Sequence, residues 1–188
     1  MKKNHGMRAA LAALAACLLL AACGDNKVSR NFTGFIQDWG PQTTQSGSTS
    51  QVKSEILDYD TPTFGDSLGF DVTAWPNTKA LEPVGYYAVD GWFGQIEYHT
   101  PDGRILVVRV AEEAAGGLPA TYRESHSQGA ALQLDGLQVQ RRPGTGGCVM
   151  YTWERDGFQF MVHSNKAFAA PSDAEIETMV KGLAARPV

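Results

Sequence analysis

The chain has 188 residues, of which 43% are hydrophobic and 19% are charged, and its formal net charge is −4. This length suits one globular domain with a sizeable core plus a linker. The acidic balance argues against nucleic acid as a partner and against a polybasic patch for anionic lipids.

The first 22 residues predict a signal peptide for export. Lys2, Lys3 and Arg8 form a basic leader without acids, and residues 9–22 are almost wholly Ala and Leu, which is the pattern of a secretory signal. The apolar run is shorter than the roughly 20 residues of a membrane-spanning helix, so we expect it to be cleaved. Cleavage removes three basic residues, which takes the formal net charge from −4 to about −7.

The leader ends in Leu20-Ala21-Ala22-Cys23, which resembles the lipobox of bacterial lipoproteins. In that family the Cys sulfur receives a diacylglycerol, cleavage follows at the bond that joins Ala22 to Cys23, and the new amine is often acylated, for example with palmitate. Two or three acyl chains make a stable anchor where one would not. The resemblance therefore implies an exported protein, tethered by lipid on Cys23 to the bacterial cell membrane or the outer membrane.

Two alternatives to this anchor stay open. An ordinary signal peptide that happens to end in Cys would release a soluble exported protein. The segment Leu14-Ala15-Ala16-Cys17 mimics the motif, but cleavage there would leave almost no apolar run, so Cys23 is preferred.

Residues 23–54 predict a flexible tether, since residues 42–51 are rich in Ser, Thr, Gln and Gly. One short stretch breaks this polar pattern. Large apolar residues recur there with helical spacing, which predicts an amphipathic helix over residues 31–39; they are Phe32, Phe35, Ile36 and Trp39. This helix could dock on the parent domain, lie in the membrane interface or bind a partner.

Residues 55–188 predict an α+β globular domain. Alternating or continuous apolar runs, separated by Asp-Gly and Pro-Asp-Gly turns, indicate antiparallel strands. The expected strands cover residues 69–75, 84–89, 92–99, 104–110, 130–134, 137–142, 148–153 and 158–164. We therefore expect an antiparallel sheet of about six to eight strands, preceded by the signal peptide and the linker.

A helix closes the expected domain. Ser172 with Glu175 makes a capping box, and Ile176, Met179 and Leu183 belong to the apolar stripe that follows. Because such a stripe must be buried, we expect the helix to pack on one face of the sheet.

The order of these elements resembles a bacterial family of domains of unknown function. The resemblance rests on the strands and turns of residues 87–109, on Tyr151-Thr152-Trp153 with the Asp-Gly turn after it, and on the capped helix. Members are frequent at the C-terminal end of exported or membrane-anchored proteins, and some are appended to regions similar to outer-membrane lipoprotein-sorting proteins. The resemblance covers residues 64–183 and implies no catalytic residues.

No paired-cysteine, metalloprotease, nucleophile-elbow, phosphate-loop or dinucleotide motif occurs. We therefore expect no cofactor and no metal, and we interpret the protein as a non-enzymatic binding or accessory module of the cell envelope, with an envelope protein or an apolar ligand as its partner. A hydrolase would need Cys148 with His99, His126 or His163 as a nucleophile and base, but a strand cysteine is usually a small buried hydrophobe.

The main alternative is a carrier or sensor of an apolar ligand. It rests on the similarity to lipoprotein-sorting proteins and on the many large rings of the sheet. Trp92 and Phe93 are adjacent on an expected strand and so face opposite sides. One of these sides is a candidate apolar surface for a ligand or partner.

Overall fold

The computed structural model describes residues 56–118, 129–144, 149–164 and 170–188. The helices in this part of the chain are too short or too polar to cross a bilayer. The expected signal peptide, tether and amphipathic helix over residues 31–39 lie outside the described residues.

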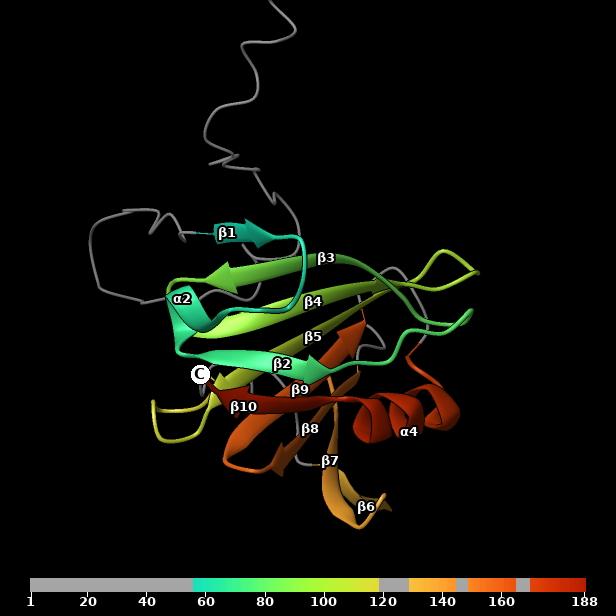
Figure 1. The fold of residues 1–188 in the computed structure, drawn as a ribbon. Helices are drawn as coiled ribbons and strands as arrows, with labels where there is room; N and C mark the ends of the chain where they lie inside the picture. The colour runs from blue at the N-terminus through green and yellow to red at the C-terminus, as the bar shows by residue number, and fades with distance from the viewer. Residues whose placement is uncertain (1–55, 119–128, 145–148, 165–169) are drawn as a thin grey trace, which may run out of the picture.

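Eight strands form one antiparallel sheet in the order β1-β3-β4-β5-β9-β8-β7-β6, and β2 and β10 form a second sheet (Figure 1). The helices and strands are β1 (Ile56–Tyr59), α2 (Gly65–Leu68), β2 (Phe70–Ala74), β3 (Glu82–Val89), β4 (Phe93–His99), β5 (Ile105–Glu112), β6 (Ala130–Leu134), β7 (Leu137–Pro143), β8 (Val149–Arg155), β9 (Phe158–Ser164), α4 (Asp173–Gly182) and β10 (Ala184–Pro187). The predicted antiparallel sheet and the C-terminal helix are confirmed.

One face of the main sheet, which we call the inner face, carries the larger core. Ile96 on β4, Val108 on β5 and Val162 on β9 lie opposite one another across the strands, and each is fully buried. Trp153 and Phe160 stack in the same layer, with ring centroids 5.4 Å apart. Because successive residues of a strand point to opposite faces, every second residue joins this layer.

Helix α4 begins at the capping box that the sequence predicts. The Ser172 backbone N–H donates to the Glu175 carboxylate at 2.7 Å, and the Glu175 backbone N–H donates to Ser172 Oγ. Three helix residues, Ile176, Met179 and Val180, are buried in the same core cluster as the inner-face residues. Figure 1 shows α4 leading directly into β10, which lies beside β2.

Three Asp-Gly turns join neighbouring strands: Asp90-Gly91, Asp135-Gly136 and Asp156-Gly157. All six residues have φ between 52° and 81°. Asp and Gly tolerate this left-handed backbone better than other residues, and it matches the twist of adjacent antiparallel strands. The turns therefore fix the hairpins where the sequence predicts them.

The structure differs from the sequence prediction at Trp92. We expected Trp92 on a strand, facing the side opposite to Phe93. Val89 pairs with Phe93 instead, so Trp92 belongs to the turn before β4. The alternation of side chains along a strand does not apply to a residue in a turn. Trp92 therefore packs in the same smaller cluster as Phe93.

Two strands were not predicted. β1 has four residues and pairs with β3 at one edge of the main sheet. β10 follows α4 directly and pairs with β2, which thereby lies in the second sheet. Both pairings join segments that are distant in sequence, so no local sequence pattern predicts them.

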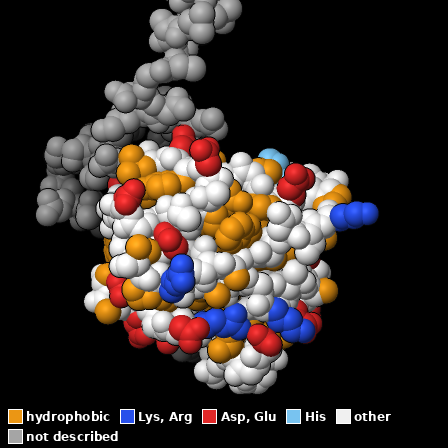
Figure 2. Space-filling view, viewed as in Figure 1, with side chains coloured by type: hydrophobic (Ala, Val, Ile, Leu, Met, Phe, Trp, Pro, Cys, Tyr) orange, Lys and Arg blue, Asp and Glu red, His pale blue; other side chains and the backbone are white. Residues whose placement is uncertain are grey.

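Figure 2 shows the molecule from the side that carries β2, β10 and α4. Acidic and basic side chains are interspersed there around small areas of hydrophobic side chains. Charges of both signs that alternate in this way are typical of a solvated surface rather than of a site that attracts one sign of charge.

Candidate functional site

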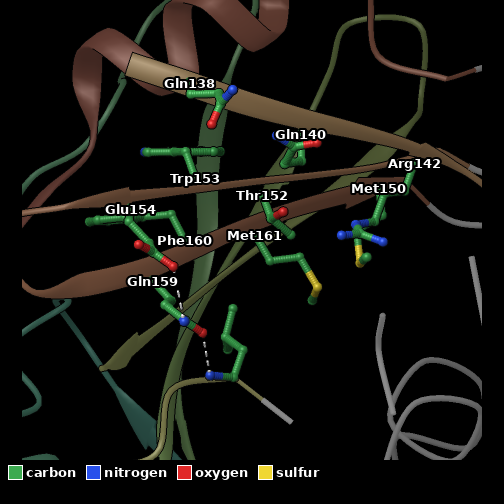
Figure 3. A pocket seen from close by; sticks show the side chains of 11 residues that line it. Gln138, Gln140, Arg142, Met150, Thr152, Trp153, Glu154, Gln159, Phe160 and Met161 are labelled. Carbon is green, nitrogen blue, oxygen red and sulfur yellow. Dashed lines mark hydrogen bonds between the residues drawn. The ribbon is translucent and has the colours of Figure 1, made fainter. Parts of the chain in front are cut away.

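The other face of the main sheet, which we call the outer face, contains a polar groove. It lies over β7, β8 and β9 and has a volume of about 370 Å³. The side chains that point into it alternate with inner-face residues along each strand. They are Gln138, Gln140 and Arg142 on β7, Met150, Thr152 and Glu154 on β8, and Gln159 and Met161 on β9, with Leu118 from the loop after β5 (Figure 3). We call this set the outer groove.

The floor of the outer groove is apolar. Met150 and Met161 are at most 1% exposed, and Leu118 is 6% exposed. The three belong to the smaller hydrophobic cluster of the molecule. Because these side chains are almost fully buried, they support the groove from within the domain, and unbranched Met side chains fill such irregular spaces well.

A hydrogen-bond chain holds one side of the outer groove. Gln159 Oε1 accepts a bond of 3.0 Å from the Leu118 backbone N–H, and Gln159 Nε2 donates a bond of 3.2 Å to Glu154 Oε1. Figure 3 shows both bonds as dashed lines. The amide of Gln159 thereby orients the Glu154 carboxylate and ties the loop at Leu118 to the sheet.

Arg142 lies near the opposite end of the outer groove, beside Met150 (Figure 3). Its Nε is buried, and among the described residues it has no hydrogen-bond partner. None of the ion pairs in this part of the chain includes Arg142. Buried polar atoms are nearly always satisfied, so the guanidinium of Arg142 has hydrogen-bonding capacity left over at this end of the groove.

A buried polar row continues from the groove across the sheet. Arg109 lies opposite Met161 and is 2% exposed. Its Nε donates to Gln95 Oε1 at 2.9 Å, and its guanidinium carbon lies 5.2 Å from the centroid of the Phe93 ring. The amide and the ring both stabilise the buried cation. Arg109 is thus built into the sheet, whereas Arg142 faces the groove.

The outer groove carries hydrogen-bonding groups rather than reactive ones. Among the described residues, its lining contains glutamine amides, a threonine hydroxyl, one guanidinium and one carboxylate, and no Ser, Cys or His. Covalent catalysis needs a nucleophile beside a base. Within the described residues no three His, Cys, Asp or Glu side chains gather as metal ligands. The arrangement supports recognition of a polar ligand.

Most site residues expected from the sequence lie outside the described residues: Ala22, Cys23, Phe32, Phe35, Ile36 and Trp39. The structure does bring Trp92 and Phe93 together, in the cluster of the outer face. Phe93 is only 3% exposed, and Trp92 is partly buried. Neither lines the outer groove.

The cysteine and histidines are placed only in part. Cys148 and His126 lie outside the described residues. His163 is 3% exposed on β9, opposite Met150 in the strand register. The His99 side chain is 50% exposed and lies 3.5 Å from the Glu97 carboxylate. The structure brings no pair of the proposed hydrolase residues together among those it describes.

The sequence analysis missed the outer groove. A signal was present, because Gln138, Gln140 and Arg142 alternate along the expected strand and so share one face. Their pairing with β8 was equally readable from the hairpin order. The hydrogen bond that brings Gln159 to Leu118 joins residues 41 positions apart, and no local pattern indicates it.

The chain matches no family model, and neither a curated protein nor a solved structure is similar enough to count as a match.

Proposed function

We propose that the protein is a lipid-anchored bacterial lipoprotein whose domain is a non-enzymatic binding module of the cell envelope, with the outer groove as its ligand site. The observation that carries the binding role is that Arg142 Nε has no hydrogen-bond partner among the described residues, in a groove of amides above an apolar floor. Ligand sites of this kind combine apolar walls with a few polar groups that fix orientation.

The proposed anchor rests on the sequence. Leu20 to Cys23 resemble a lipobox, and the apolar run before them is too short to span a membrane. Lipid on Cys23 would hold the acidic domain at the cell membrane or the outer membrane, since acidic side chains do not favour anionic headgroups.

The division of the two sheet faces supports the binding role. We propose that α4 covers the inner face, because Ile176, Met179 and Val180 are buried among the inner-face side chains. The outer face is then the one that offers its groove to a ligand. A tether before the domain would let this face reach other envelope components.

A carrier of apolar ligands is the second reading. A cavity among the inner-face side chains near α4 would favour this reading. Large aromatic rings, however, occupy much of that layer. Trp153 stacks on Phe160, and Phe70 packs against Phe158 with ring centroids 5.2 Å apart. This close ring packing favours the polar groove over an inner apolar cavity.

The proposal is tested by mixing the full-length protein with the soluble products of a cell-envelope digest. Compounds that co-elute with the protein are then identified by mass spectrometry. We expect retained compounds with unchanged mass, and we expect Thr152→Trp to abolish retention because the indole fills the groove.

Thr73→Trp is the matched control, since Thr73 is an exposed strand residue of β2. It should retain the same compounds as the unaltered protein. If Thr152→Trp retains the same compounds as the unaltered protein, the assignment of the outer groove as the ligand site is contradicted. Chemical conversion of a retained compound, lost in Cys148→Ala or His163→Ala, would contradict the non-enzymatic role.

A further inference from the structure

We propose that the outer groove recognises a short zwitterionic peptide of about four residues, with its carboxylate at Arg142 and its ammonium group at Glu154. This inference deepens the proposed binding function and rests on it. It follows from where the two charges of the groove lie and from what separates them.

The two charges lie at opposite ends of the groove. Arg142 is opposite Met150 in the strand register, and Glu154 stands four residues further along β8. At about 3.4 Å per residue, the two positions are about 14 Å apart along the strands. Figure 3 shows them on opposite sides of Thr152 and Gln140.

Both charges are free to take a ligand. Among the described residues Arg142 Nε has no hydrogen-bond partner and no ion pair includes Arg142, and a guanidinium binds a carboxylate through two parallel hydrogen bonds. Glu154 is exposed and accepts one hydrogen bond, from the neutral amide of Gln159. Within the described part of the chain no Lys or Arg forms an ion pair with Glu154.

The middle of the groove matches a peptide backbone. Gln140 and Thr152 lie there, opposite each other in the strand register, and their amide and hydroxyl groups both donate and accept hydrogen bonds. Backbone N–H and C=O groups need partners of both kinds.

The separation of the Arg142 and Glu154 positions along the strands sets the length of the ligand. An extended chain spans at most about 3.5 Å per residue, so four residues reach about 14 Å. A lone phosphate or carboxylate would engage Arg142 and leave Glu154 unused. An uncharged sugar would leave both charges without partners.

The test measures the dissociation constant of the full-length protein for tetra-alanine by isothermal titration calorimetry. Three forms of the peptide are compared: free at both ends, acetylated at the amine, and amidated at the carboxylate. We expect either cap to weaken binding about tenfold, because each cap removes one charge-assisted contact.

Two substitutions identify the partner of each end. In Arg142→Gln the peptide with a free carboxylate and the amidated peptide should bind equally tightly. The acetylated peptide should still bind about tenfold more weakly than the free peptide. In Glu154→Gln the peptide with a free amine and the acetylated peptide should bind equally tightly. The amidated peptide should still bind about tenfold more weakly than the free peptide. Arg142→Lys should restore part of the preference for the free acid, since the charge returns without the bidentate fork.

Arg186→Gln and Glu82→Gln are the matched controls, because both residues are exposed and lie on other strands, β10 and β3. They should leave all three constants unchanged. Capped peptides that bind as tightly as the free peptide would overturn the inference. So would an absence of binding by free tetra-alanine at about 1 mM.

Failure of this inference is distinct from failure of the proposed function. If tetra-alanine does not bind but compounds of the envelope digest are retained in a Thr152-dependent way, the peptide is wrong and the groove still binds a ligand. If the digest also yields no retained compound, both proposals fall.

Discussion

Arg104 and Glu175, which are 71 positions apart in the chain, form a two-pronged ion pair between the start of β5 and the first turn of α4. Arg104 Nη1 donates to Glu175 Oε2 at 3.1 Å, and Arg104 Nη2 donates to Glu175 Oε1 at 2.5 Å. The same carboxylate closes the capping box with Ser172. One side chain thus caps the helix and ties it to the main sheet.

This pair predicts a pH dependence of stability. Burial alone would raise the pKa of the Glu175 carboxyl, but the hydrogen bonds from Arg104 and Ser172 outweigh burial and lower it. A carboxyl with a lowered folded-state pKa stabilises the fold above its ordinary pKa of 4.5 and loses this contribution as the pH falls through the folded value.

We therefore expect Arg104→Gln to lower the free energy of unfolding by about 1 kcal/mol at pH 7 and by much less at pH 3. Urea unfolding at both pH values measures the difference. Glu177→Gln, which removes an exposed carboxylate on the same helix, serves as the control. Equal losses for Arg104→Gln at both pH values would contradict the assigned role of Glu175.

A second prediction concerns two tyrosines of the inner face. Tyr98 is fully buried, its hydroxyl has no hydrogen-bond partner among the described residues, and burial raises its pKa. Tyr151 is also buried, but its hydroxyl accepts from Arg141 Nε at 3.3 Å and donates to the Pro171 carbonyl at 3.5 Å.

Tyr98→Phe should raise the free energy of unfolding by about 1 kcal/mol, because it removes an unsatisfied buried hydroxyl. Tyr151→Phe should lower it by about 1 kcal/mol. The raised pKa of Tyr98 means that the fold loses stability as the pH rises above the ordinary value of 10, and Tyr98→Phe should reduce that loss. Chemical denaturation measures the free energy of unfolding of both variants and its dependence on pH. Changes of the same sign in Tyr98→Phe and Tyr151→Phe would contradict the assigned difference between an unpartnered and a hydrogen-bonded hydroxyl.

A third prediction tests a close approach in the core. A Cβ added at Gly94 would lie 2.6 Å from Phe64 Cε2, and Phe64 is fully buried. Gly94→Ala should therefore cost about 1–3 kcal/mol of stability through overpacking.

Shortening the opposing ring should relieve that cost. In a Phe64→Leu background, Gly94→Ala should be less damaging than in the unaltered chain, which a double-mutant cycle of thermal unfolding measures. Additive losses would show that the ring is not the cause.

A fourth prediction concerns the proposed anchor. Cys23→Ser should move the protein from the detergent phase to the aqueous phase, and mass spectrometry should find no acyl groups on it, because the serine hydroxyl does not replace the thiol as lipid acceptor. Cys17→Ser should leave the protein lipidated. An aqueous-phase protein with an unmodified Cys23 in the unaltered chain would contradict the anchor.

Local patterns predicted much of the fold. The Asp135-Gly136 and Asp156-Gly157 turns predicted two hairpins at their observed places, because left-handed turn residues and alternating apolar residues act over a few positions. Ser172 and Glu175 predicted the start of α4 for the same reason. Signals of this kind depend only on residues that are close in sequence, so a single amino-acid sequence is enough to recognise them.

Long-range pairings could not be predicted in this way. The four residues of β1 and of β10 carry weak strand signals, and β10 includes Pro187. Their places are set by packing against β3 and β2. The groove depends likewise on the bond that brings Gln159 to Leu118, so its polar residues were visible in the sequence while its shape was not.

The most direct test of the binding role is the methyl spectrum of the full-length protein labelled with ¹³C at its methionine methyl groups. Met150 and Met161 form the floor of the outer groove, and Met179 lies in the core contributed by α4. On addition of a cell-envelope digest, we predict that the signals of Met150 and Met161 shift while that of Met179 stays in place. A shift of Met179 alone would contradict the account, because it would put the ligand in the inner-face core near α4.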